Sequence, residues 1–513
     1  MSFYDDASII MIPTGVKASK LYCAKPTDGS GDLTFTRTGS TATRVNSAGL
    51  IEECRTNLLL NSATLSTQNV TVVAAPYTLS FFGTGTVTLS GTGSGSLVGT
   101  GANDRVSLTF TPTAGTLTLT VSGSVTSAQL EIGNVMTNYI ATTSAAVTVG
   151  TIANIPRLDY TGGGCPKLLL EPTRTNSVIY SEMFDNSAWT KSLTDVSGNM
   201  IVSPDGYQSA DLLIPNTTLS SSHRVERGGG SVTTPNIYTG SVFVKYGGYD
   251  YVNIELTNYL AASFTYRFST GVISNATGAG LVAGSPKAEN YGNGWIRLSL
   301  SSTLPSGNGT AVVRINFRNN SNSANFAGDG VSGVYAWGYQ LELGSNPTSY
   351  IPTWNASVTR NLDICVKNSI SSLIGQTEGT FFADITITNT SQNRSIFAID
   401  INSTTDFITG IINSPNTIVF NIRKDSVFTT LVTSSSITLG RHKLAFAYKS
   451  GEYALYIDGV QIGLSTSTQY PSGTLSQLII SNTAYGQLFD GFNQAILFKT
   501  RLSNSDLATL TTI

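Results

Sequence analysis

The residues that most often carry catalysis are scarce in this chain. It contains only two histidines, His223 and His442, which lie about 220 residues apart. A zinc site of the HExxH type needs two histidines one helical turn apart, and neither histidine stands in a recognisable Ser-His-Asp motif. His442 lies between Arg441 and Lys443, a position typical of a surface residue. We therefore predict no catalytic residue, no enzymatic activity and no cofactor.

Acidic pairs and metal ligands also give no clear site. A glycosidase needs two carboxyl groups about 5–10 Å apart, but Asp250 and Glu255 have an odd spacing that sends them to opposite faces of a strand. Asp384, Asp400 and Asp490 could contribute to a calcium site, which takes oxygens from several loops. They form no compact cluster in the sequence, so we assign no metal.

The cysteines are spread across the chain without CxxC spacing. This pattern indicates neither a disulfide framework nor a structural zinc site. We expect all four to be free and buried: Cys23, Cys54, Cys165 and Cys365.

Three tyrosines indicate a binding site of another kind. Tyr246, Tyr249 and Tyr251 flank the turn Gly247-Gly248, so at least one ring should face solvent. Sandwich proteins bind sugars by placing aromatic rings in loops, where the ring faces meet sugar C–H bonds inside a polar rim. These tyrosines are our candidate glycan-binding residues. The alternative is that they only pack on the neighbours of a hairpin.

One long passage occurs twice. Residues 128–148 and 339–359 are identical at eleven of 21 aligned positions, and both contain the pattern Gln-Leu-Glu-x-Gly. Repetition favours a structural role for the shared glutamates, Glu131 and Glu342, in which each carboxylate holds a nearby loop or pairs with a repeated arginine. Those arginines are Arg55 and Arg174. The chain therefore contains a duplicated module, which suggests a modular binding or structural protein.

The elements that must position these residues are strands. Apolar residues alternate with Ser, Thr and Gly at a period of two, and turns rich in Gly and Asn separate the runs. We predict an all-β fold of tandem antiparallel β-sandwiches of jelly-roll type, with very little helix. Four parts are expected: a leader over residues 1–54, a small sandwich over 55–150, a larger sandwich over 151–366 and a jelly roll over 367–513.

Two local features can be placed within these parts. Phe243, Trp295 and Trp337 lie in strand patterns of the larger sandwich and are expected in its core. A helix is expected near the C-terminus, because Ser503 can cap it and Asp506 occupies the matching capping-box position.

Composition and charge exclude several classes of partner. Charged residues make up 12% of the chain, the net charge is −2 and no basic stripe occurs, so we expect no nucleic acid partner. No stretch approaches the ~20 apolar residues of a membrane span. The N-terminus has Asp5 and Asp6 where a signal peptide would carry positive charge. We expect synthesis in the cytoplasm without a signal peptide and no membrane insertion.

Several segments together carry a family resemblance. Residues 21–62, which include RTNLLLNS, are similar to the opening of fibre and appendage proteins of tailed phages, especially crAss-like and other phages of gut Bacteroidetes. Residues 180–189 (YSEMFDNSAW) and 293–297 (NGWIR) resemble the carbohydrate-binding-type sandwich of such virion proteins. Residues 453–463 and 498–503 are similar to a laminin-G/concanavalin-A-like jelly roll.

The resemblance implies a structural virion protein that forms a phage head fibre or tail fibre. Its lectin-like domains would adhere to host-surface glycans. It would contact other capsid or tail proteins through the leader, with the jelly roll distal, and would form a homotrimer or, as the alternative, a dimer. A second hypothesis is a purely structural capsid or tail appendage that binds no soluble ligand.

Overall fold

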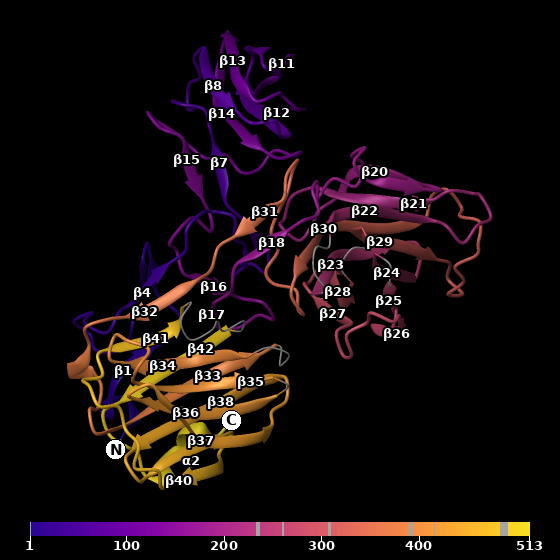
Figure 1. The fold of residues 1–513 in the computed structure, drawn as a ribbon. Coiled ribbons are helices and arrows are strands. Elements are labelled where there is room, and N and C mark those ends of the chain that lie inside the picture. Colours follow the sequence, from indigo (N-terminus) through magenta and orange to yellow (C-terminus); the bar gives the residue numbers. More distant parts are fainter. Residues whose placement is uncertain are drawn as a thin grey trace.

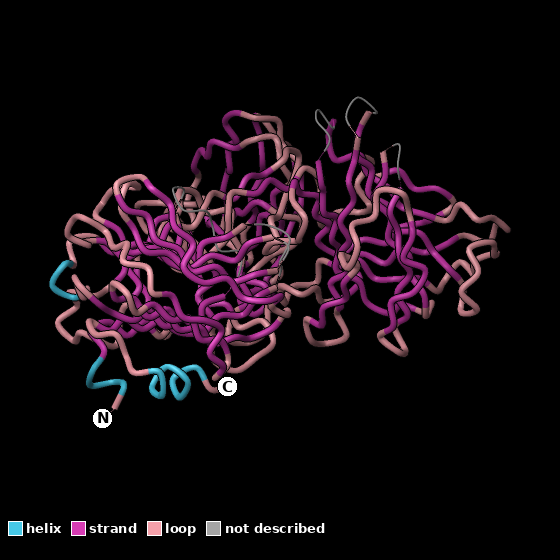
Figure 2. Tube along the Cα trace, turned by 60° about the horizontal axis from the view of Figure 1, so that its bottom comes forward, coloured by secondary structure: helices cyan, strands magenta, loops and turns pink. Residues whose placement is uncertain are grey.

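Antiparallel strands make up nearly all of the regular structure. The structure, a computed structural model, describes residues 2–231, 236–258, 261–305, 309–388, 393–414, 416–482 and 491–513. The helices of these ranges are short and lie at the periphery (Figure 2): α1 (Phe3–Asp6), the 3₁₀ helix η1 (Ser371–Leu373) and α2 (Asn504–Thr511). The predicted all-β fold of antiparallel sandwiches is therefore confirmed.

The small sandwich stands at the top of Figure 1. Its strands are β8 (Gln68–Val72), β9 (Tyr77–Gly83), β10 (Thr86–Gly91), β11 (Gly95–Val98), β12 (Gly101–Phe110), β13 (Gly115–Ser122) and β14 (Val125–Ile132). They form sheets of order β11-β10-β13-β8 and β12-β9-β14. Alternate residues such as Leu79, Phe81 and Leu119 fill the space between the sheets. At its base, β7 (Arg55–Asn57) pairs with β15 (Val147–Val149).

The second sandwich consists of two six-stranded sheets. One contains β19 (Thr190–Ser192), β22 (Arg224–Ser231), β29 (Thr310–Arg318), β24 (Tyr251–Thr257), β25 (Ala261–Arg267) and β26 (Val272–Thr277) in that order. The other contains β20 (Thr194–Ile201), β21 (Ala210–Pro215), β30 (Gly333–Leu343), β23 (Asn236–Gly247), β28 (Ile296–Leu304) and β27 (Lys287–Asn290) in that order. At its base, β18 (Arg174–Asn176) pairs with β31 (Val358–Arg360).

The outer face of the β23 sheet carries a core of its own. Phe243, Trp295 and Trp337 are buried there with Tyr350 and Ile51, whereas their strand neighbours face the main core of the sandwich. Strand alternation explains the split, because successive side chains point to opposite faces. The prediction that these three aromatic residues are buried is confirmed, but they serve the smaller outer core.

The C-terminal sandwich is the largest body. Its first sheet contains β1 (Ala7–Met11), β16 (Arg157–Asp159), β17 (Lys167–Leu169), β33 (Glu378–Ile387), β38 (Gly440–Lys449), β39 (Tyr453–Ile457), β40 (Val460–Ser465) and β42 (Gly491–Phe498). Its second sheet contains β2 (Val16–Lys17), β3 (Lys20–Leu21), β4 (Leu33–Thr36), β32 (Ile364–Lys367), β34 (Arg394–Asp400), β35 (Phe407–Asn413), β36 (Thr417–Lys424), β37 (Val427–Ser436) and β41 (Gln477–Ser481). A short ladder of β5 (Arg44–Val45) and β6 (Ile51–Glu52) lies in the connecting region.

The leader expected over residues 1–54 is not a separate unit. Strand β1 pairs with β42, and β4 pairs with β32, so the N-terminal strands complete both sheets of the C-terminal sandwich. Leu33 and Phe35 alternate inward and join the same core as Phe397. Figure 1 shows both termini in this one body. An arrangement with the leader at one end and the jelly roll at the other is therefore wrong.

The C-terminal helix α2 begins as its sequence indicates. The Oγ atom of Ser503 accepts a hydrogen bond from the backbone N–H of Asp506 at 3.1 Å, and the Ser503 hydroxyl donates to the Asp506 carboxylate at 2.6 Å. The predicted cap is confirmed.

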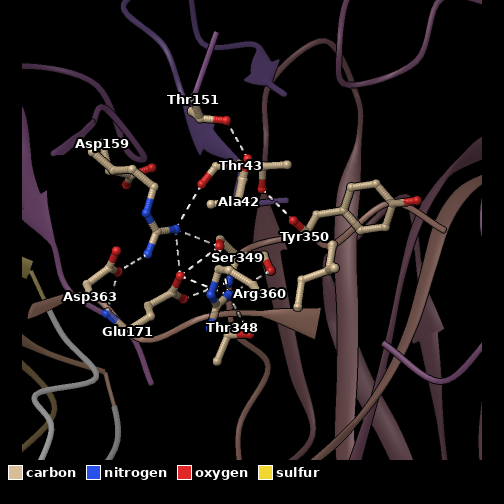
Figure 3. Close-up of polar contacts among 12 residues, drawn as sticks. Ala42, Thr43, Thr151, Asp159, Glu171, Thr348, Ser349, Tyr350, Arg360 and Asp363 are labelled. Carbon is tan, nitrogen blue, oxygen red and sulfur yellow. Dashed lines mark hydrogen bonds and ion pairs between the residues drawn. The ribbon is translucent and has the colours of Figure 1, made fainter. Parts of the chain in front are cut away.

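A buried ion-pair cluster joins the segments between the sandwiches. Two acids, Glu171 and Asp363, contact three arginines, Arg37, Arg157 and Arg360. Figure 3 shows Glu171 and Arg360 pointing toward each other, with an Nη1–Oε2 distance of 3.0 Å. Burial alone would raise the pKa of Glu171, but Arg360 and Arg157 outweigh it and hold the pKa at about 2. The carboxylate is therefore ionised wherever the protein is folded at ordinary pH.

Candidate functional site

The repeated glutamates form the same structure in both copies. Glu131 accepts hydrogen bonds from the side-chain amide of Gln129 at 2.7 Å and from the backbone N–H of Thr137 at 2.8 Å. Glu342 accepts the equivalent bonds in the second copy, at 2.6 and 2.8 Å. We call each arrangement a clasp, because it ties the loop after the strand to the strand itself. Both carboxylates are buried, which confirms the structural interpretation.

The repeated arginines do not behave alike. Arg174 lies 3.7 Å from Glu342, as predicted. Arg55 instead contacts Glu53 at 3.0 Å and Asp205 at 3.1 Å, which brings the base of the small sandwich against a loop of the second sandwich.

The acidic residues around β24 are each neutralised by an arginine. Asp250 contacts Arg267 at 2.7 Å, and Glu255 contacts Arg314 at 2.8 Å. A carboxylate that is held in an ion pair is fixed in position. Each of these acids is therefore better suited to holding a loop or strand in place than to transferring a proton.

Both histidines are enclosed. A ring nitrogen of His223 lies 2.7 Å from the carbonyl oxygen of Leu193, and Nδ1 of His442 lies 2.6 Å from the Asp458 carboxylate. The prediction of a surface position for His442 is wrong. In β38 the side chains of Arg441 and Lys443 face outward, so alternation turns the histidine between them inward.

The acids considered for calcium have protein partners. Asp384 accepts hydrogen bonds from Arg441 at 2.8 Å and from Asn493 at 2.9 Å. Asp400 accepts one from the backbone N–H of Asn402 at 2.8 Å, whereas Asp490 lies outside the described residues. Within the described ranges, no group of three or more His, Cys, Asp or Glu side chains is placed to hold a metal ion.

All four cysteines are free. Cys365 is buried, and Cys23 and Cys54 are partly buried. Cys165 is exposed, because it follows three consecutive glycines with positive φ in an open loop, so the prediction of burial is wrong for this residue.

The structure separates the three candidate tyrosines. Tyr246 is 53% exposed, but Tyr249 is only 7% exposed and packs its ring 5.4 Å from that of Phe326. The Tyr251 ring is half-buried beneath the guanidinium of Arg267, 5.1 Å away. Only Tyr246 therefore presents a free ring face to solvent.

Tyr246 lies in an open hollow of about 490 Å³ at one end of the second sandwich. We call it the tyrosine hollow. Its walls come from the end of β23, the turn before β24, the end of β25 and the loop after β29: Tyr246, Asp250, Phe268, Ser269 and Asn320. The rings of Tyr246 and Phe268 meet edge to face, with centroids 6.2 Å apart.

The polar rim of the tyrosine hollow is held in place before any ligand arrives. The Asp250 carboxylate accepts hydrogen bonds from Arg267 and from the Ser269 hydroxyl, both at 2.7 Å. The backbone N–H of Asp250 donates to the side-chain oxygen of Asn320 at 2.7 Å. Partial burial raises the pKa of Asp250, but the bonds from Arg267 and Ser269 outweigh it and lower that pKa. A rim fixed in this way loses little conformational freedom on binding.

This arrangement suits a sugar ring. Two aromatic side chains offer apolar surface for C–H groups, and an ionised carboxylate and a side-chain amide accept and donate hydrogen bonds beside them. The sequence did not identify Phe268 and Asn320, because they are far from Tyr246 in the chain. The signals that point to them are a strand ending in an aromatic residue and the turn Asn319-Asn320-Ser321-Asn322.

Comparison with known proteins identifies the fold of the last part of the chain. Residues 363–504 match the family model of the concanavalin A-like lectin/glucanases superfamily. No curated protein matches the chain. None of the helices in the described ranges has the length and apolar character needed to cross a membrane.

A search of solved structures gives matches to a carbohydrate-binding domain and to laminin domains. The Ruminococcus gnavus IT-sialidase CBM40 bound to α2,3-sialyllactose is 14% identical, with a TM-score of 0.25, and the match covers 28% of this chain and 91% of that one. The mouse laminin α1 chain domains LG4-5 are 11% identical, with a TM-score of 0.19, covering 57% of this chain and 92% of that one.

Proposed function

We propose that this chain is a structural virion protein of a phage head or tail fibre and that it adheres to host-surface glycans. The observation that carries the adhesion proposal is the tyrosine hollow, where an exposed ring, a half-buried ring and a preformed polar rim meet. The lectin-type fold of residues 363–504 adds support. The virion role is supported by the resemblance of residues 21–62 to phage fibre proteins.

The proposal includes no catalytic role. The support for leaving catalysis out is that the candidate acids already have partners. An arginine or a clasp holds each of them: Asp250, Glu255, Glu131 and Glu342. Hydrolysis of a glycosidic bond needs a free acid and a second carboxylate across the sugar.

The virion-facing end should be the C-terminal sandwich together with its N-terminal strands. The tyrosine hollow lies on a different body, the second sandwich, so the two tasks can be separated in space. We further propose a homotrimer in the virion. Three weak sites of about millimolar affinity, roughly −4 kcal/mol each, would gain about 10²–10⁴ in apparent affinity through avidity.

A glycan array with the protein coupled to multivalent beads tests the adhesion proposal. We expect wild-type beads to bind at least one host-type glycan and Tyr246→Ala beads to lose most of that binding. Tyr246→Phe should retain it, because the ring face remains. Tyr4→Ala is the matched control, since Tyr4 is 51% exposed on a different body.

The same experiment decides between the two hypotheses. If wild-type beads bind no glycan on the array and no host cells in a parallel adhesion assay, the result supports the purely structural appendage. If both Tyr246→Ala and Tyr4→Ala bind like wild type, adhesion uses another surface. Light scattering of the purified protein measures the oligomeric state, and a monomer at micromolar concentration contradicts the trimer.

A further inference from the structure

A second cavity, of about 140 Å³, lies where the second sandwich, the C-terminal sandwich and their connecting segments meet. Strands β27 and β28 contribute Lys287 and Arg297, and β17 contributes Lys167. Strand β33 contributes Thr386. No residue of this cavity lines the tyrosine hollow, so the two are separate features.

The connecting segments close the cavity on the side of the ion-pair cluster. Figure 3 shows Thr43, Asp159 and Ser349 on this side, and all three line the cavity. The Asp159 carboxylate faces backbone donors here: it accepts from the N–H of Val45 at 2.9 Å and from that of Thr161 at 3.2 Å.

Arg297 is the most deeply buried cation of the cavity. It is 3% exposed, and its guanidinium stacks 5.3 Å from the Phe243 ring. One Nη atom donates to the Ser241 hydroxyl at 3.0 Å, but Nε has no hydrogen-bond partner. A buried donor without an acceptor is costly. Arg297 lines the cavity, so an oxygen bound there can pair with its guanidinium.

The charges around the cavity do not balance internally. Arg44 is paired with Glu52 at 2.7 Å, and Glu171 is held by the ion-pair cluster. The remaining cations are Lys167, Lys287 and Arg297, and within the described part of the chain no ion pair joins them to a carboxylate. The remaining acids among the described lining residues are Asp159 and Glu289, so one positive charge is left over within this set.

Hydroxyl groups supply further donors. Burial raises the pKa of Tyr291 to about 12, so this phenol is protonated at neutral pH and can donate a hydrogen bond.

The ammonium of Lys287 is fixed between the two sandwiches. Its Nζ donates a hydrogen bond to the backbone carbonyl of Thr388 at 2.9 Å.

We propose that this cavity binds one small oxyanion group, a carboxylate, sulfate or phosphate, held by Arg297, Lys287 and Lys167. Because Arg297 and Lys287 belong to the second sandwich and Lys167 to the C-terminal sandwich, the anion holds the two bodies together. A cavity of about 150 Å³ takes a single benzene ring, so this one has room for one such group and not for an oligosaccharide.

The anion can come from a free inorganic ion or from the acidic group of a sugar. Isothermal titration with sulfate, phosphate, glucuronate and glucose, at constant ionic strength in chloride, separates these sources. We expect saturable binding of one sulfate or phosphate per chain and no binding of glucose. Saturable binding of glucuronate without sulfate or phosphate binding would assign the site to an acidic sugar.

Two lysine variants provide the structural test. Lys167→Gln should weaken anion binding by about tenfold or more, because it removes one of the three cations that line the cavity. Lys245→Gln is the matched control: Lys245 is a half-buried lysine on β23 that lies outside the cavity, and its variant should bind like wild type. Circular dichroism checks that both variants are folded. The Tyr246→Ala variant should bind the anion like wild type, which distinguishes this site from the tyrosine hollow.

Two outcomes overturn the proposal. One is the absence of saturable binding for all three anions. The other is equal anion affinity in wild type and a folded Lys167→Gln variant. Anions can also stabilise the protein by a general salt effect. In that case thermal stability rises with anion concentration without saturating, and it rises equally in both lysine variants. This result also counts against the site.

Discussion

Arg37 and Asp363 form a fully buried ion pair at 3.2 Å although 326 positions separate them in the sequence. Arg37 follows the N-terminal strand β4, and Asp363 precedes β32, the strand that pairs with it. Asp363 also receives a hydrogen bond from Arg157 in the connecting segment. The Asp363 carboxylate therefore links the N-terminal strands, the connecting segment that contains Arg157 and the C-terminal sandwich.

Asp363→Asn should destabilise the C-terminal sandwich strongly. The variant leaves two buried guanidinium groups without their shared carboxylate, and breaking a buried pair in this way costs about 3–5 kcal/mol. Urea unfolding measures the loss. Asp104→Asn, at an exposed position of β12, is the control and should change stability by less than about 0.5 kcal/mol. A similar small effect in both variants would contradict the role given to Asp363.

Tyr249→Ala should act on stability, in contrast to Tyr246→Ala. The Tyr249 ring is buried against Phe326, so its removal leaves a cavity and should cost about 3 kcal/mol. Tyr246 is exposed, and its truncation should stay within about 0.5 kcal/mol of wild type. Thermal unfolding of the two variants side by side checks the difference. Equal melting temperatures would show that the two rings are not placed as described.

The two clasps should contribute independently. Glu342→Ala removes the acceptor of the bonds from Gln340 and Thr348 and leaves buried donors unpaired, at a cost of about 2–4 kcal/mol. Glu131→Ala should have a similar effect in the small sandwich. Hydrogen exchange of each sandwich, measured separately, should show faster exchange only where the mutation lies. The effects should add in the double variant, because the sites share no partner. Spread of either effect to the other sandwich would contradict this.

Stability should fall as pH rises from about 5 to about 8. Glu53, Glu182 and Asp205 are buried around the guanidinium of Arg55. Burial raises the pKa of Glu53 to about 7 and raises the pKa values of Glu182 and Asp205 as well. The pKa of Glu53 is higher in the folded protein than its unfolded value of 4.5. The stabilisation that protonated Glu53 provides is therefore complete below about pH 4.5, and it is lost as the pH rises through about 7.

Glu182→Gln tests this pH dependence. The amide can still accept the hydrogen bond that Tyr350 donates at 3.0 Å, but it carries no charge. We expect the variant to lose less stability than wild type between these pH values, because burial raises the pKa of Glu182 in the folded protein. Glu452→Gln, with an exposed side chain, is the control and should follow wild type. Unfolding free energies measured across the pH range provide the check, and parallel curves for all three proteins would contradict it.

Local patterns were sufficient for the strands, the helix cap and the clasps. The period of two in segments such as β4 and β29 predicts which side chains are buried, because alternation is a property of the strand itself. The clasps were visible because the same glutamate, glutamine and threonine occur at the same spacing twice. The tyrosine at the tip of β23 was also identified, since glycines beside it mark a turn.

Tertiary structure alone decided how these elements are combined. Nothing in the sequence around β4 indicates that its partner is β32, because strand pairing depends on matching edges and a shared core and not on local residues. For the same reason the tyrosine hollow needs Tyr246, Phe268 and Asn320 from three separate segments of the chain. Sequence by itself determined which residues lie in strands, turns and caps, since those preferences act over a few neighbouring residues. The partners of Arg37, Arg55 and Arg297 were decided by packing, which brings together side chains that the chain keeps far apart.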